Sequence, residues 1–567
     1  MKKVNAYNLP EEYLREKLSK MKAGQIIDRI WQKDYTVWSK EPEEIVNRLG
    51  WLTAHEIESD KLQAILQYVK EIHSDRFSNI LLLGMGGSSM APEVFQKIFS
   101  ARSGYPVLSV LDTTNPDTIL RIEETVPLSN THFIVSTKSG KTVETLSLMK
   151  HYYNKVVDEV GRQQAGRQFT AITDPGSYLE KQATELDFKY TFLNDPDIGG
   201  RYSALSYFGL VPAAVIGLDL NKLLKSASTM FGNALSKIIS PEDNSPAWLG
   251  AVAGTCAEQG KDKLTFIFPP EIKAFGAWLE QLIAESTGKN GRGIVPVNGE
   301  PVSPPEYYAK DRLFINFRLC ENNSRRDNNV EALIEAGHPV VQLRLDNLYD
   351  LGGELYRWMF ATAVAGWAIG INPYDQPNVE AAKVQARRFI DAYGKTGSLS
   401  EINANLDKGE VAVFNNFEAQ SLEEAWQLFL NSLDTGGLPR SYIAIQAYLP
   451  PTPETDCSLE KLRNKLQQQY RVAVTVGYGP RFLHSTGQLH KGDAGKGLFI
   501  QLTANPQSDI TIPDEAGDNN SSISFAVLIK AQALGDRQAL IDSGRKIIRY
   551  HLKKDIGRGI DRLIEAL

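Results

Sequence analysis

The sequence contains little cysteine and no long hydrophobic run. Its three cysteines, Cys256, Cys320 and Cys457, are widely separated among 567 residues, which favours neither a disulfide framework nor a thiolate metal cluster. No apolar stretch reaches the length that a membrane-spanning helix requires, and the charged segment 1–20 is not typical of a secretory signal. We therefore expect a cytoplasmic protein that depends on neither disulfides nor a membrane.

A large excess of charge of one sign is also missing. The chain has 62 Lys and Arg residues against 68 Asp and Glu residues, which gives a net charge of −6 and an isoelectric point near 5.9. No block of Lys and Arg is long enough to form a basic stripe on the surface. We therefore expect neither nucleic acid nor an anionic membrane as a partner.

Short apolar runs alternate with amphipathic helices along most of the chain. Continuous apolar strands separated by helices predict parallel sheets that are covered on both faces. The expected fold class is α/β, with a helical lead-in at 1–56, two similar domains at 57–217 and 240–395, and a C-terminal α/β domain at 396–567. The predicted strands are 80–83, 107–111, 133–136 and 170–173 in the first domain, 264–268, 293–297, 313–317 and 339–345 in the second, and 442–448, 472–476, 498–502 and 524–529 in the third.

Two turns in the first domain have the composition of phosphate-binding loops. The strand at 80–83 continues into Gly-Met-Gly-Gly-Ser-Ser at 84–89, where glycines let backbone amides approach an anion at the start of a helix. The strand at 133–136 continues into Thr-Lys-Ser-Gly-Lys-Thr at 137–142, whose hydroxyls and cations suit a phosphate monoester. Neither turn has the spacing of a Walker A loop or a dinucleotide fingerprint, and a plain polar turn is the alternative for each. Because ligands bind beyond the carboxyl ends of parallel strands, both turns are expected at one edge of the sheet.

Five motifs, in order, resemble those of the glucose-6-phosphate isomerase family, which is built on paired sugar isomerase (SIS) domains. They are GMGGSS at 84–89, TKSGKTVET at 137–145, GGRYSALS at 199–206, ESTGKNGRG at 285–293 and NPYDQPNVEAAK at 372–383. The resemblance implies two SIS-type parallel-sheet sandwich domains, with Gly87 and Ser88 beside a sugar phosphate. It also implies four phosphate ligands, which are Thr137, Lys138, Ser139 and Thr142.

The same resemblance implies a catalytic base at Glu285, an active-site arginine at Arg201, and two further site residues at Gln376 and Lys383. An aldose–ketose isomerisation without a metal needs a group that carries a proton between neighbouring carbons, and Glu285 ends an amphipathic helix before a glycine-rich turn. Arg201 offers a fixed charge for an enediolate oxygen. Gln376 and Lys383, seven positions apart, would share one helix face if the helix starts near Pro377. The competing interpretation of Glu285 is an ordinary exposed glutamate, that of Arg201 is a structural salt bridge, and that of Lys383 is a surface lysine.

The histidine that opens the sugar ring departs from the family pattern. His338 is the only histidine between Glu285 and Gln376, and its context, EAGHPVV, does not resemble the histidine motif. A better match, HSTGQ, begins at His484 in the C-terminal domain. We therefore infer that the ring-opening histidine is His484, with a structural histidine as the alternative. In the family this histidine can come from a neighbouring subunit, so the resemblance implies a homodimer with a shared site.

The late HSTGQ motif also resembles the isomerase half of fused transaldolase–isomerase proteins. The chain before the first predicted strand is too short for a (β/α)₈ barrel, so we expect no Schiff-base aldolase activity. His484 and His490 lack a third His or Cys at ligand spacing, and we expect no metal or other cofactor.

The resemblance as a whole implies a glucose-6-phosphate isomerase of glycolysis and gluconeogenesis that interconverts glucose 6-phosphate and fructose 6-phosphate. One alternative is an isomerase that accepts both glucose and mannose phosphates, which the sequence does not distinguish. Another is a non-catalytic SIS-type regulator, although such a protein has no need of Glu285, Arg201 and Lys383 together. An amidotransferase-type isomerase would need a cysteine nucleophile near the N-terminus, where this chain has Lys2.

Overall fold

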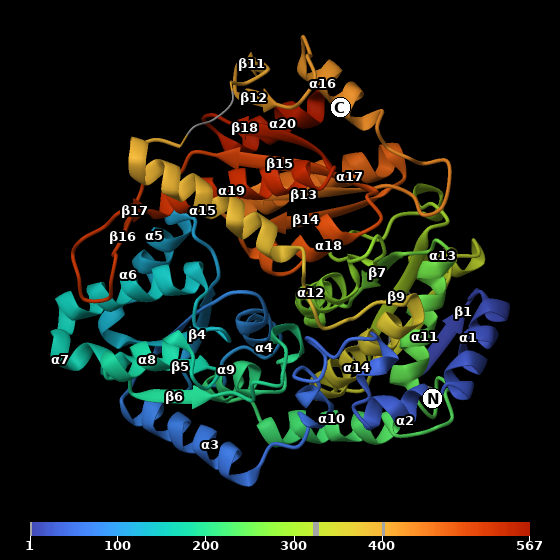
Figure 1. Cartoon of the computed structure of the whole chain (residues 1–567), viewed down its shortest axis with the longest axis horizontal. Coiled ribbons are helices and arrows are strands. Elements are labelled where there is room, and N and C mark those ends of the chain that lie inside the picture. The colour runs from blue at the N-terminus through green and yellow to red at the C-terminus, as the bar shows by residue number, and fades with distance from the viewer. Residues whose placement is uncertain (1–2, 321–327, 400–402) are drawn as a thin grey trace.

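The computed structural model describes residues 3–320, 328–399 and 403–567. Three large sheets form three lobes around the centre of the molecule, as Figure 1 shows with the first sheet in cyan and green, the second in green and yellow, and the third in orange and red. Within these residues, none of the helices combines the length and the apolarity needed to cross a bilayer.

The first sheet is entirely parallel, and it is buried on both faces. Its strands run in the order β3-β2-β4-β5-β6, with β2 at Asn79–Gly84, β3 at Val107–Leu111, β4 at Thr131–Ser136, β5 at Phe169–Thr173 and β6 at Tyr190–Leu193. Alternate side chains of β2 belong to two different cores, because Ile80 and Leu82 pack on one face while Leu81 and Leu83 pack on the other. The four strands predicted here are confirmed, and β6 is added to them.

Helices surround this sheet and continue its strands through short turns. They are α3 (Ser59–Ser74), α4 (Met90–Phe99), α5 (Pro116–Thr125), α6 (Val143–Val160), α7 (Arg162–Ala165), α8 (Tyr178–Glu185) and α9 (Tyr207–Val215). The two predicted loops fall where β2 enters the single 3-10 turn η3 (Gly86–Ser88) before α4, and where β4 leads into α6. Both loops therefore lie at the carboxyl edge of neighbouring parallel strands.

The second sheet includes a strand from the lead-in. Its order is β1-β10-β9-β7-β8, with β1 at Val4–Tyr7, β10 at Val340–Leu345, β9 at Arg312–Leu319, β7 at Lys263–Ile267 and β8 at Val295–Val297. The lead-in was predicted to be helical, and α1 (Glu11–Ala23) and α2 (Ile26–Trp31) agree with that, but β1 does not. Four residues are too few to show a two-residue period; this strand is defined by its antiparallel pairing with β10.

The helices of the second lobe and the lead-in share one core with the first lobe. They are α10 (Leu220–Ala234), α11 (Ser245–Glu258), α12 (Phe275–Thr287), α13 (Asn328–Glu335) and α14 (Leu351–Ile369). A single hydrophobic cluster runs through all three segments, from Trp51 of the lead-in to Phe208 of the first lobe and Trp358 of the second. The lead-in is thus packed as part of a continuous interior.

The C-terminal sheet has four parallel strands, and two antiparallel strands extend it at one side. Its order is β11-β12-β18-β15-β13-β14, with β11 at Leu406–Lys408, β12 at Val411–Phe414, β13 at Tyr442–Tyr448, β14 at Ala473–Tyr478, β15 at Gly497–Ala504 and β18 at Lys546–Leu552. Its helices are α16 (Leu422–Leu430), α17 (Pro453–Tyr470), α18 (Gly487–Gly492), α19 (Phe525–Asp542) and α20 (Ile556–Glu565). A short ribbon of β16 (Thr511–Ile512) and β17 (Ile523–Ser524) precedes α19.

The strand predicted at 524–529 is wrong. Only its first residue, Ser524, is in a strand, and the remainder begins α19. The side chain of Ser524 caps this helix by accepting a hydrogen bond from the amide of Val527. A short apolar run of a buried helix has the same pattern as a buried strand, and the parallel strand of this region is β18 instead.

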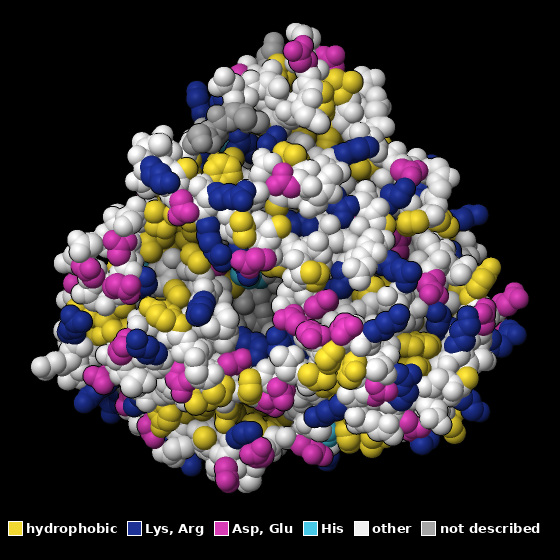
Figure 2. All heavy atoms as spheres, in the orientation of Figure 1, with side chains coloured by type: hydrophobic (Ala, Val, Ile, Leu, Met, Phe, Trp, Pro, Cys, Tyr) yellow, Lys and Arg dark blue, Asp and Glu magenta, His cyan; other side chains and the backbone are white. Residues whose placement is uncertain are grey.

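Helix α15 (Val379–Thr396) joins the second lobe to the C-terminal one and packs lengthwise against α19. Figure 1 shows it in yellow, passing above the centre of the molecule between the first lobe and the C-terminal sheet. The space-filling view is hollowed just below α15, with Lys and Arg side chains and a histidine at the rim of the hollow (Figure 2).

We predict that the contact between α11 and α14 requires glycine at position 250. A Cβ atom there would lie 2.3 Å from the carbonyl oxygen of Ala361. The resulting overpacking in Gly250→Ala should lower the free energy of unfolding by about 1–3 kcal/mol and, with it, the melting temperature. The matched variant is Gly232→Ala in α10, where a Cβ atom meets nothing within 4 Å. This substitution should stabilise the helix by about 0.5–1 kcal/mol. Thermal denaturation of both variants tests this prediction, and equal melting temperatures would contradict it.

Candidate active site

Three glycine-containing segments meet at the centre of the molecule. A Cβ atom on Gly87 would lie 2.0 Å from the carbonyl oxygen of Gly200, in the 3-10 turn η6 (Gly200–Tyr202). A Cβ atom on Gly86, which has a φ of +56°, would lie 3.1 Å from the Cβ atom of His484. Only glycine allows these approaches, so the loop after β2 touches both the arginine segment and the C-terminal domain. Ser88 is buried beside it, and its carbonyl oxygen accepts a hydrogen bond from Ser136.

Arg201 is buried and every nitrogen atom of its guanidinium group is engaged. Its Nε donates to Ser286 Oγ at 2.9 Å, and its Nη1 donates to Gln376 Oε1 at 2.8 Å. Its Nη2 donates to the carbonyl oxygens of Pro373 and Asp375 at 2.8 and 3.0 Å. Arg201 thereby brings the first lobe, α12 and the segment before α15 into one cluster.

Glu285 forms an ion pair with this arginine. Its Oε1 lies 3.1 Å from Arg201 Nη1, and only 15% of its side chain is exposed. Its Oε2 accepts a hydrogen bond of 3.2 Å from Gln281 Nε2, one turn earlier on α12. The same Gln281 nitrogen donates to the carbonyl oxygen of His484 at 2.9 Å, so one amide group connects the predicted base with the segment that carries the predicted histidine.

His484 lies in the 3-10 turn η11 (Arg481–His484), and it reaches the first lobe within one chain. Its Nε2 lies 2.9 Å from Oε1 of Glu144, in the first turn of α6. Gln532 of α19 donates to the same carboxylate oxygen at 2.7 Å and is itself held by Thr114. Burial of the Glu144 carboxyl group opposes its ionisation, but the charge and the hydrogen bond of His484 outweigh burial, and the pKa of Glu144 is lowered.

Glu144 is a residue of the site that the sequence did not predict. A glutamate in the first turn of a helix usually interacts with the helix dipole at the surface, and nothing in the local pattern distinguishes this one. Its burial and its bond to a histidine 340 positions away appear only in the folded chain. A carboxylate bonded to an imidazole orients the ring.

The side chains of the predicted phosphate loop have different surroundings. The hydroxyls of Thr137 and Thr142 lie 2.9 Å apart, and Ser139 is exposed at the tip of the loop with its oxygen accepting from the amide of Lys141 at 3.3 Å. Lys138 is engaged elsewhere, because its ammonium group pairs with Asp174 and donates to the carbonyl oxygen of Pro196 at 2.9 Å. Lys138 thus holds the loop against the strand ends of the same sheet.

A cavity of about 240 Å³ connects the phosphate loop with His484. Its lining includes Ser139, Thr142, Glu144 and His484 on one side and Lys383 on the side formed by α15. The cavity therefore brings together residues of the first lobe, α15 and the C-terminal domain.

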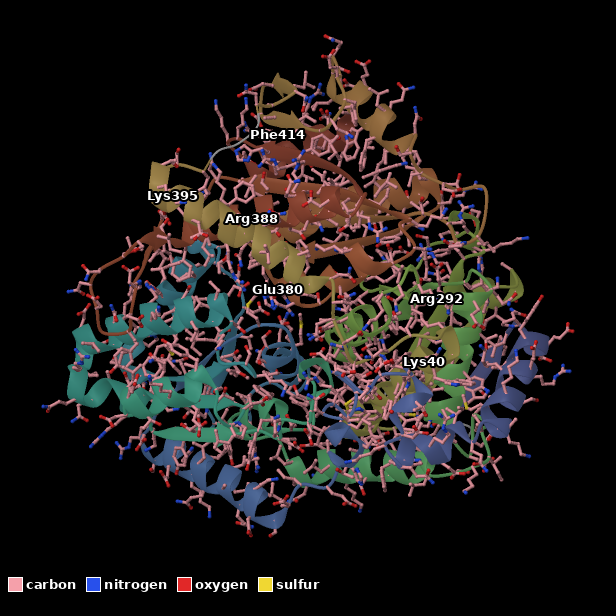
Figure 3. The ribbon with its side chains drawn as sticks, viewed as in Figure 1. Lys40, Arg292, Glu380, Arg388, Lys395 and Phe414 are labelled. Carbon is pink, nitrogen blue, oxygen red and sulfur yellow. The ribbon has the colours of Figure 1, made fainter. Side chains whose placement is uncertain are left out.

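Gln376 and Lys383 do not share a helix face, and that prediction is wrong. Helix α15 begins at Val379, because the segment before it is held by Arg201 and by the side chain of Gln488, which accepts from the amide of Asn378 at 2.8 Å. Gln376 therefore lies in the arginine cluster. Lys383 lies at the rim of the cavity, with 47% of its side chain exposed and its Nζ 3.7 Å from Glu380, which Figure 3 labels on α15 above the centre of the molecule.

Lys289 is a second buried charge that the sequence did not predict. Its Nζ donates to the side chain of Asp375 at 2.7 Å. Burial, followed by the nearby charge of Arg201, lowers the pKa of Lys289 to about 8, although Asp375 and Glu285 act in the opposite direction. The lysine therefore connects the turn after α12 with Asp375, next to the carbonyl oxygens that Arg201 binds.

The two histidines considered as metal ligands have different surroundings. His490 is buried in the C-terminal domain, where its Nδ1 lies 3.3 Å from the side-chain nitrogen of Gln446, whereas His484 contacts Glu144. Burial lowers the pKa of His490 well below its ordinary value. Among residues 3–320, 328–399 and 403–567, no group of three His, Cys, Asp or Glu side chains has the geometry to hold a metal ion.

The η11 turn is fixed by a second charge cluster. Arg481 pairs with Glu93 of α4, and its Nε lies 3.3 Å from Asp112. Burial raises the pKa of Glu280, on α12, to about 7, although the charge of Arg481 acts in the opposite direction. The position of His484 thus depends on ionisable groups of both other lobes.

The family model for phosphoglucose isomerase matches residues 60–298. This range includes both phosphate-loop candidates, Arg201 and Glu285, and it ends before Gln376, Lys383 and His484. Among curated proteins, the chain is 28% identical to a glucose-6-phosphate isomerase of Rubrobacter xylanophilus over 57% of this chain and 85% of that protein. It is 26% identical to a glucose-6-phosphate isomerase of Campylobacter jejuni over 58% of this chain and 88% of that protein.

Solved structures share the fold. A hypothetical protein from Thermus thermophilus superposes with a TM-score of 0.57 at 25% identity, covering 68% of this chain and 99% of that one. A glucose-6-phosphate isomerase from Chlamydia trachomatis superposes with a TM-score of 0.57 at 17% identity, covering 67% of this chain and 86% of that one. The second likeness concerns the fold alone.

We predict that Glu280 makes stability depend on pH. Its folded pKa of about 7 lies above the ordinary value of 4.5, so the folded state binds more protons between these values. The free energy of unfolding therefore contains a contribution that is complete below about 4.5 and is lost as pH rises through about 7. Glu280→Gln removes this titration and should raise the melting temperature, relative to the unmodified chain, more at about pH 8 than at about pH 5.

The control for this experiment is Glu124→Gln, an exposed carboxyl group on α5. Its difference from the unmodified chain should be the same at both pH values. A Glu280→Gln difference that is equally independent of pH would contradict the prediction.

Proposed function

We propose that this chain is a member of the glucose-6-phosphate isomerase family and that it interconverts glucose 6-phosphate and fructose 6-phosphate by a metal-independent proton transfer. The observation that carries the proposal is the pairing of two acid–base units around one central region. The Glu285–Arg201 ion pair measures 3.1 Å, and the His484–Glu144 pair measures 2.9 Å. Gln281 links the two units through hydrogen bonds to Glu285 and to the backbone of His484.

We assign the proton transfer to Glu285. In the direction from aldose to ketose, the carboxylate takes the proton from C2 of the open-chain sugar and delivers to C1 either that proton or one exchanged with solvent, while the proton of the C2 hydroxyl passes to the oxygen on C1. The electrons of the C2–H bond form the enediolate, whose oxygen gains negative charge. Arg201 lies beside the carboxylate with a fixed charge that stabilises this oxygen, and its hydrogen bonds to Ser286 and to backbone carbonyls keep it oriented.

We assign ring opening to His484. The imidazole donates a proton to the ring oxygen as the bond from C1 to that oxygen breaks, the anomeric hydroxyl gives its proton to water, and Glu144 holds the ring through its hydrogen bond. Lys383 lies at the rim of the same cavity, where its ammonium group can bind sugar hydroxyls. Because one chain supplies both His484 and Glu144, this unit is complete within a single protomer.

We assign phosphate binding to the hydroxyls of Thr137, Ser139 and Thr142, with Gly87 and Ser88 beside the sugar. The loop after β4 stands at the carboxyl edge of the sheet and lines the cavity through Ser139 and Thr142. Lys138 acts in this assignment by positioning the loop, since its ammonium group is paired with Asp174.

The two alternatives from the sequence are not favoured. A non-catalytic regulator gives no reason for burying the Arg201 cluster and the His484–Glu144 pair around one region. Acceptance of mannose 6-phosphate is a matter of which C2 epimers fit, and the family relationship favours the glucose epimer. We propose further that the protein acts in the cytoplasm, in glycolysis and gluconeogenesis, and as a homodimer whose protomers each hold a complete site.

Glu285→Gln is expected to lower the turnover of fructose 6-phosphate by about 10²–10⁴-fold, because an amide does not accept the proton. A coupled assay that detects glucose 6-phosphate, run with a chelator, measures this loss. Glu271→Gln on the exposed turn before the same helix is the matched control and should keep full activity. Comparable turnover by Glu285→Gln and the unmodified chain would refute the assignment of the base.

His484→Ala is expected to separate the two chemical steps. Isomerisation of the cyclic sugar should fall by about 10²-fold or more, since the general acid is lost, while solvent protons still exchange into the open-chain substrate through Glu285. Kinetics on the cyclic sugar and NMR detection of deuterium at C1 and C2 report the two steps. The control is His73→Ala, at an exposed histidine near the end of α3, and unchanged turnover by His484→Ala would remove the histidine from the mechanism.

A further inference from the structure

The phosphate loop at 137–142 supplies less positive charge than its two lysines suggest. A phosphate monoester carries about 1.5 to 2 negative charges at neutral pH, and neutral hydroxyl groups do not balance them. Lys138 is paired with Asp174, and these two side chains are only 22% and 16% exposed. Lys141 is exposed and lines the cavity, so it is the lysine of the two that faces a ligand. A further cation from another wall of the cavity would complete the charge that a phosphate needs.

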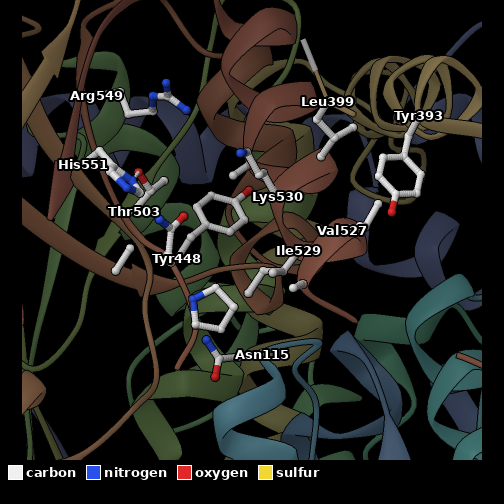
Figure 4. A pocket seen from close by; sticks show the side chains of 15 residues that line it. Asn115, Tyr393, Leu399, Tyr448, Thr503, Val527, Ile529, Lys530, Arg549 and His551 are labelled. Atoms are coloured by element: carbon white, nitrogen blue, oxygen red, sulfur yellow. Dashed lines mark hydrogen bonds between the residues drawn. The ribbon is translucent and has the colours of Figure 1, made fainter. Parts of the chain in front are cut away.

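One face of helix α15 lines the same cavity. The residues on this face recur every three or four positions, and they are Val379, Ala382, Lys383, Ala386, Arg387 and Ile390. Further along the helix, Tyr393 lines a different cavity of about 210 Å³ at the end of the C-terminal sheet, together with Val527 and Ile529 of α19 (Figure 4). The structure describes all of α15, and Lys383 and Arg387 are the charged residues that it contributes to the cavity of the phosphate loop.

Both cations are paired with Glu380, near the start of α15. Arg387 Nη2 lies 3.0 Å from Glu380 Oε1, and Lys383 Nζ lies 3.7 Å from Glu380 Oε2. The side chains of Arg387 and Glu380 are 61% and 56% exposed, and an ion pair so open to water contributes little to stability. A phosphate group offers more charge and more acceptor oxygens than a carboxylate. It can therefore replace Glu380 as the partner of Arg387.

We propose that Arg387 binds the phosphate group of the substrate and releases Glu380 when it does so. This inference rests on the proposed function, in which Thr137, Ser139 and Thr142 bind the same phosphate. The guanidinium group can donate two parallel hydrogen bonds to phosphate oxygens. The phosphate is then held by hydroxyl groups of the first lobe and by a cation of α15, and Arg387 selects phosphorylated sugars over neutral ones.

The first test is the effect of Arg387 on KM and kcat. Arg387 contacts the phosphate and not the reacting carbons, so its loss weakens the binding of substrate and transition state equally. Arg387→Gln should raise KM for fructose 6-phosphate about tenfold or more, while kcat stays within about twofold. Inorganic phosphate, which probes the phosphate group alone, should inhibit this variant about tenfold more weakly. Arg387→Lys keeps the charge without the planar fork and should raise KM by a smaller factor.

The matched control is Arg388→Gln, which removes the same charge from the next position. Arg388 is exposed, and its Nη1 lies 3.4 Å from Gln385 Oε1. It does not line the cavity, and Figure 3 labels it on α15 with Glu380. Its KM and its inhibition by inorganic phosphate should equal those of the unmodified chain.

Glu380→Gln is expected to change KM in the opposite direction. It frees Arg387 and removes a negative charge from the rim of the cavity, so KM should fall about two- to threefold. The fall should be smaller when the substitution is combined with Arg387→Gln, because the freed partner is then missing. A KM that rises in Glu380→Gln would contradict the exchange of partners.

Melting temperatures provide a readout that needs no turnover. Inorganic phosphate should raise the melting temperature of the unmodified chain and of Arg388→Gln, and should raise that of Arg387→Gln less at the same concentration. A chain that shows this pattern without isomerising fructose 6-phosphate would contradict the proposed function alone. Effects of phosphate that are the same in Arg387→Gln and Arg388→Gln would overturn the assignment of Arg387, whatever the turnover.

Discussion

The buried guanidinium group of Arg201 is the constraint on which the central region depends. Removing a charged group from water costs several kcal/mol, and the cost is met only when its hydrogen bonds and its charge are compensated. Here the compensation comes from two separate segments: Ser286 and Glu285 on α12, and the run just before α15, which supplies the side chain of Gln376 and the carbonyl oxygens of residues 373 and 375. The arginine can be buried only when these segments converge, so the ion pair fixes how the first and second lobes meet.

The C-terminal domain packs closely against this central region through α18. A Cβ atom on Gly288, just after α12, would lie 2.3 Å from the Cα atom of Leu489 on α18. Gln488 reaches back to the carbonyl oxygen of Gly288 at 2.8 Å and to the side chain of Asn378 at 2.7 Å. Because α18 directly follows His484, these contacts hold the histidine where Glu144 can bond it. The domain therefore contributes to the site through its backbone as well as through one side chain.

The sequence was sufficient for features that depend on local pattern. The apolar runs predicted the first sheet, because its strands are buried on both faces and their residues are continuously hydrophobic. The motifs at 199–206 and 285–293 named two residues that the fold brings to 3.1 Å from each other. Glu144 and Lys289 were missed because their roles arise from burial beside partners distant in the sequence. Lys138 was assigned to phosphate because composition does not reveal that Asp174 lies within reach.

The mistaken strand at 524–529 has a physical cause that also explains the position of α19 in the molecule. A helix that faces solvent on one side shows polar and apolar residues at a period of 3.6, but both long faces of α19 are covered. One face, with Lys530 and Ala533, lines the cavity at the end of the C-terminal sheet, and the other, with Leu528 and Gln532, lines the cavity of Glu144. The start of α19, from Phe525 to Ile529, is apolar at every position, so this run loses the period that would have identified a helix. The same arrangement leaves Gln532 as a polar connection across the wall, bonded to Thr114 on one side and to Glu144 on the other.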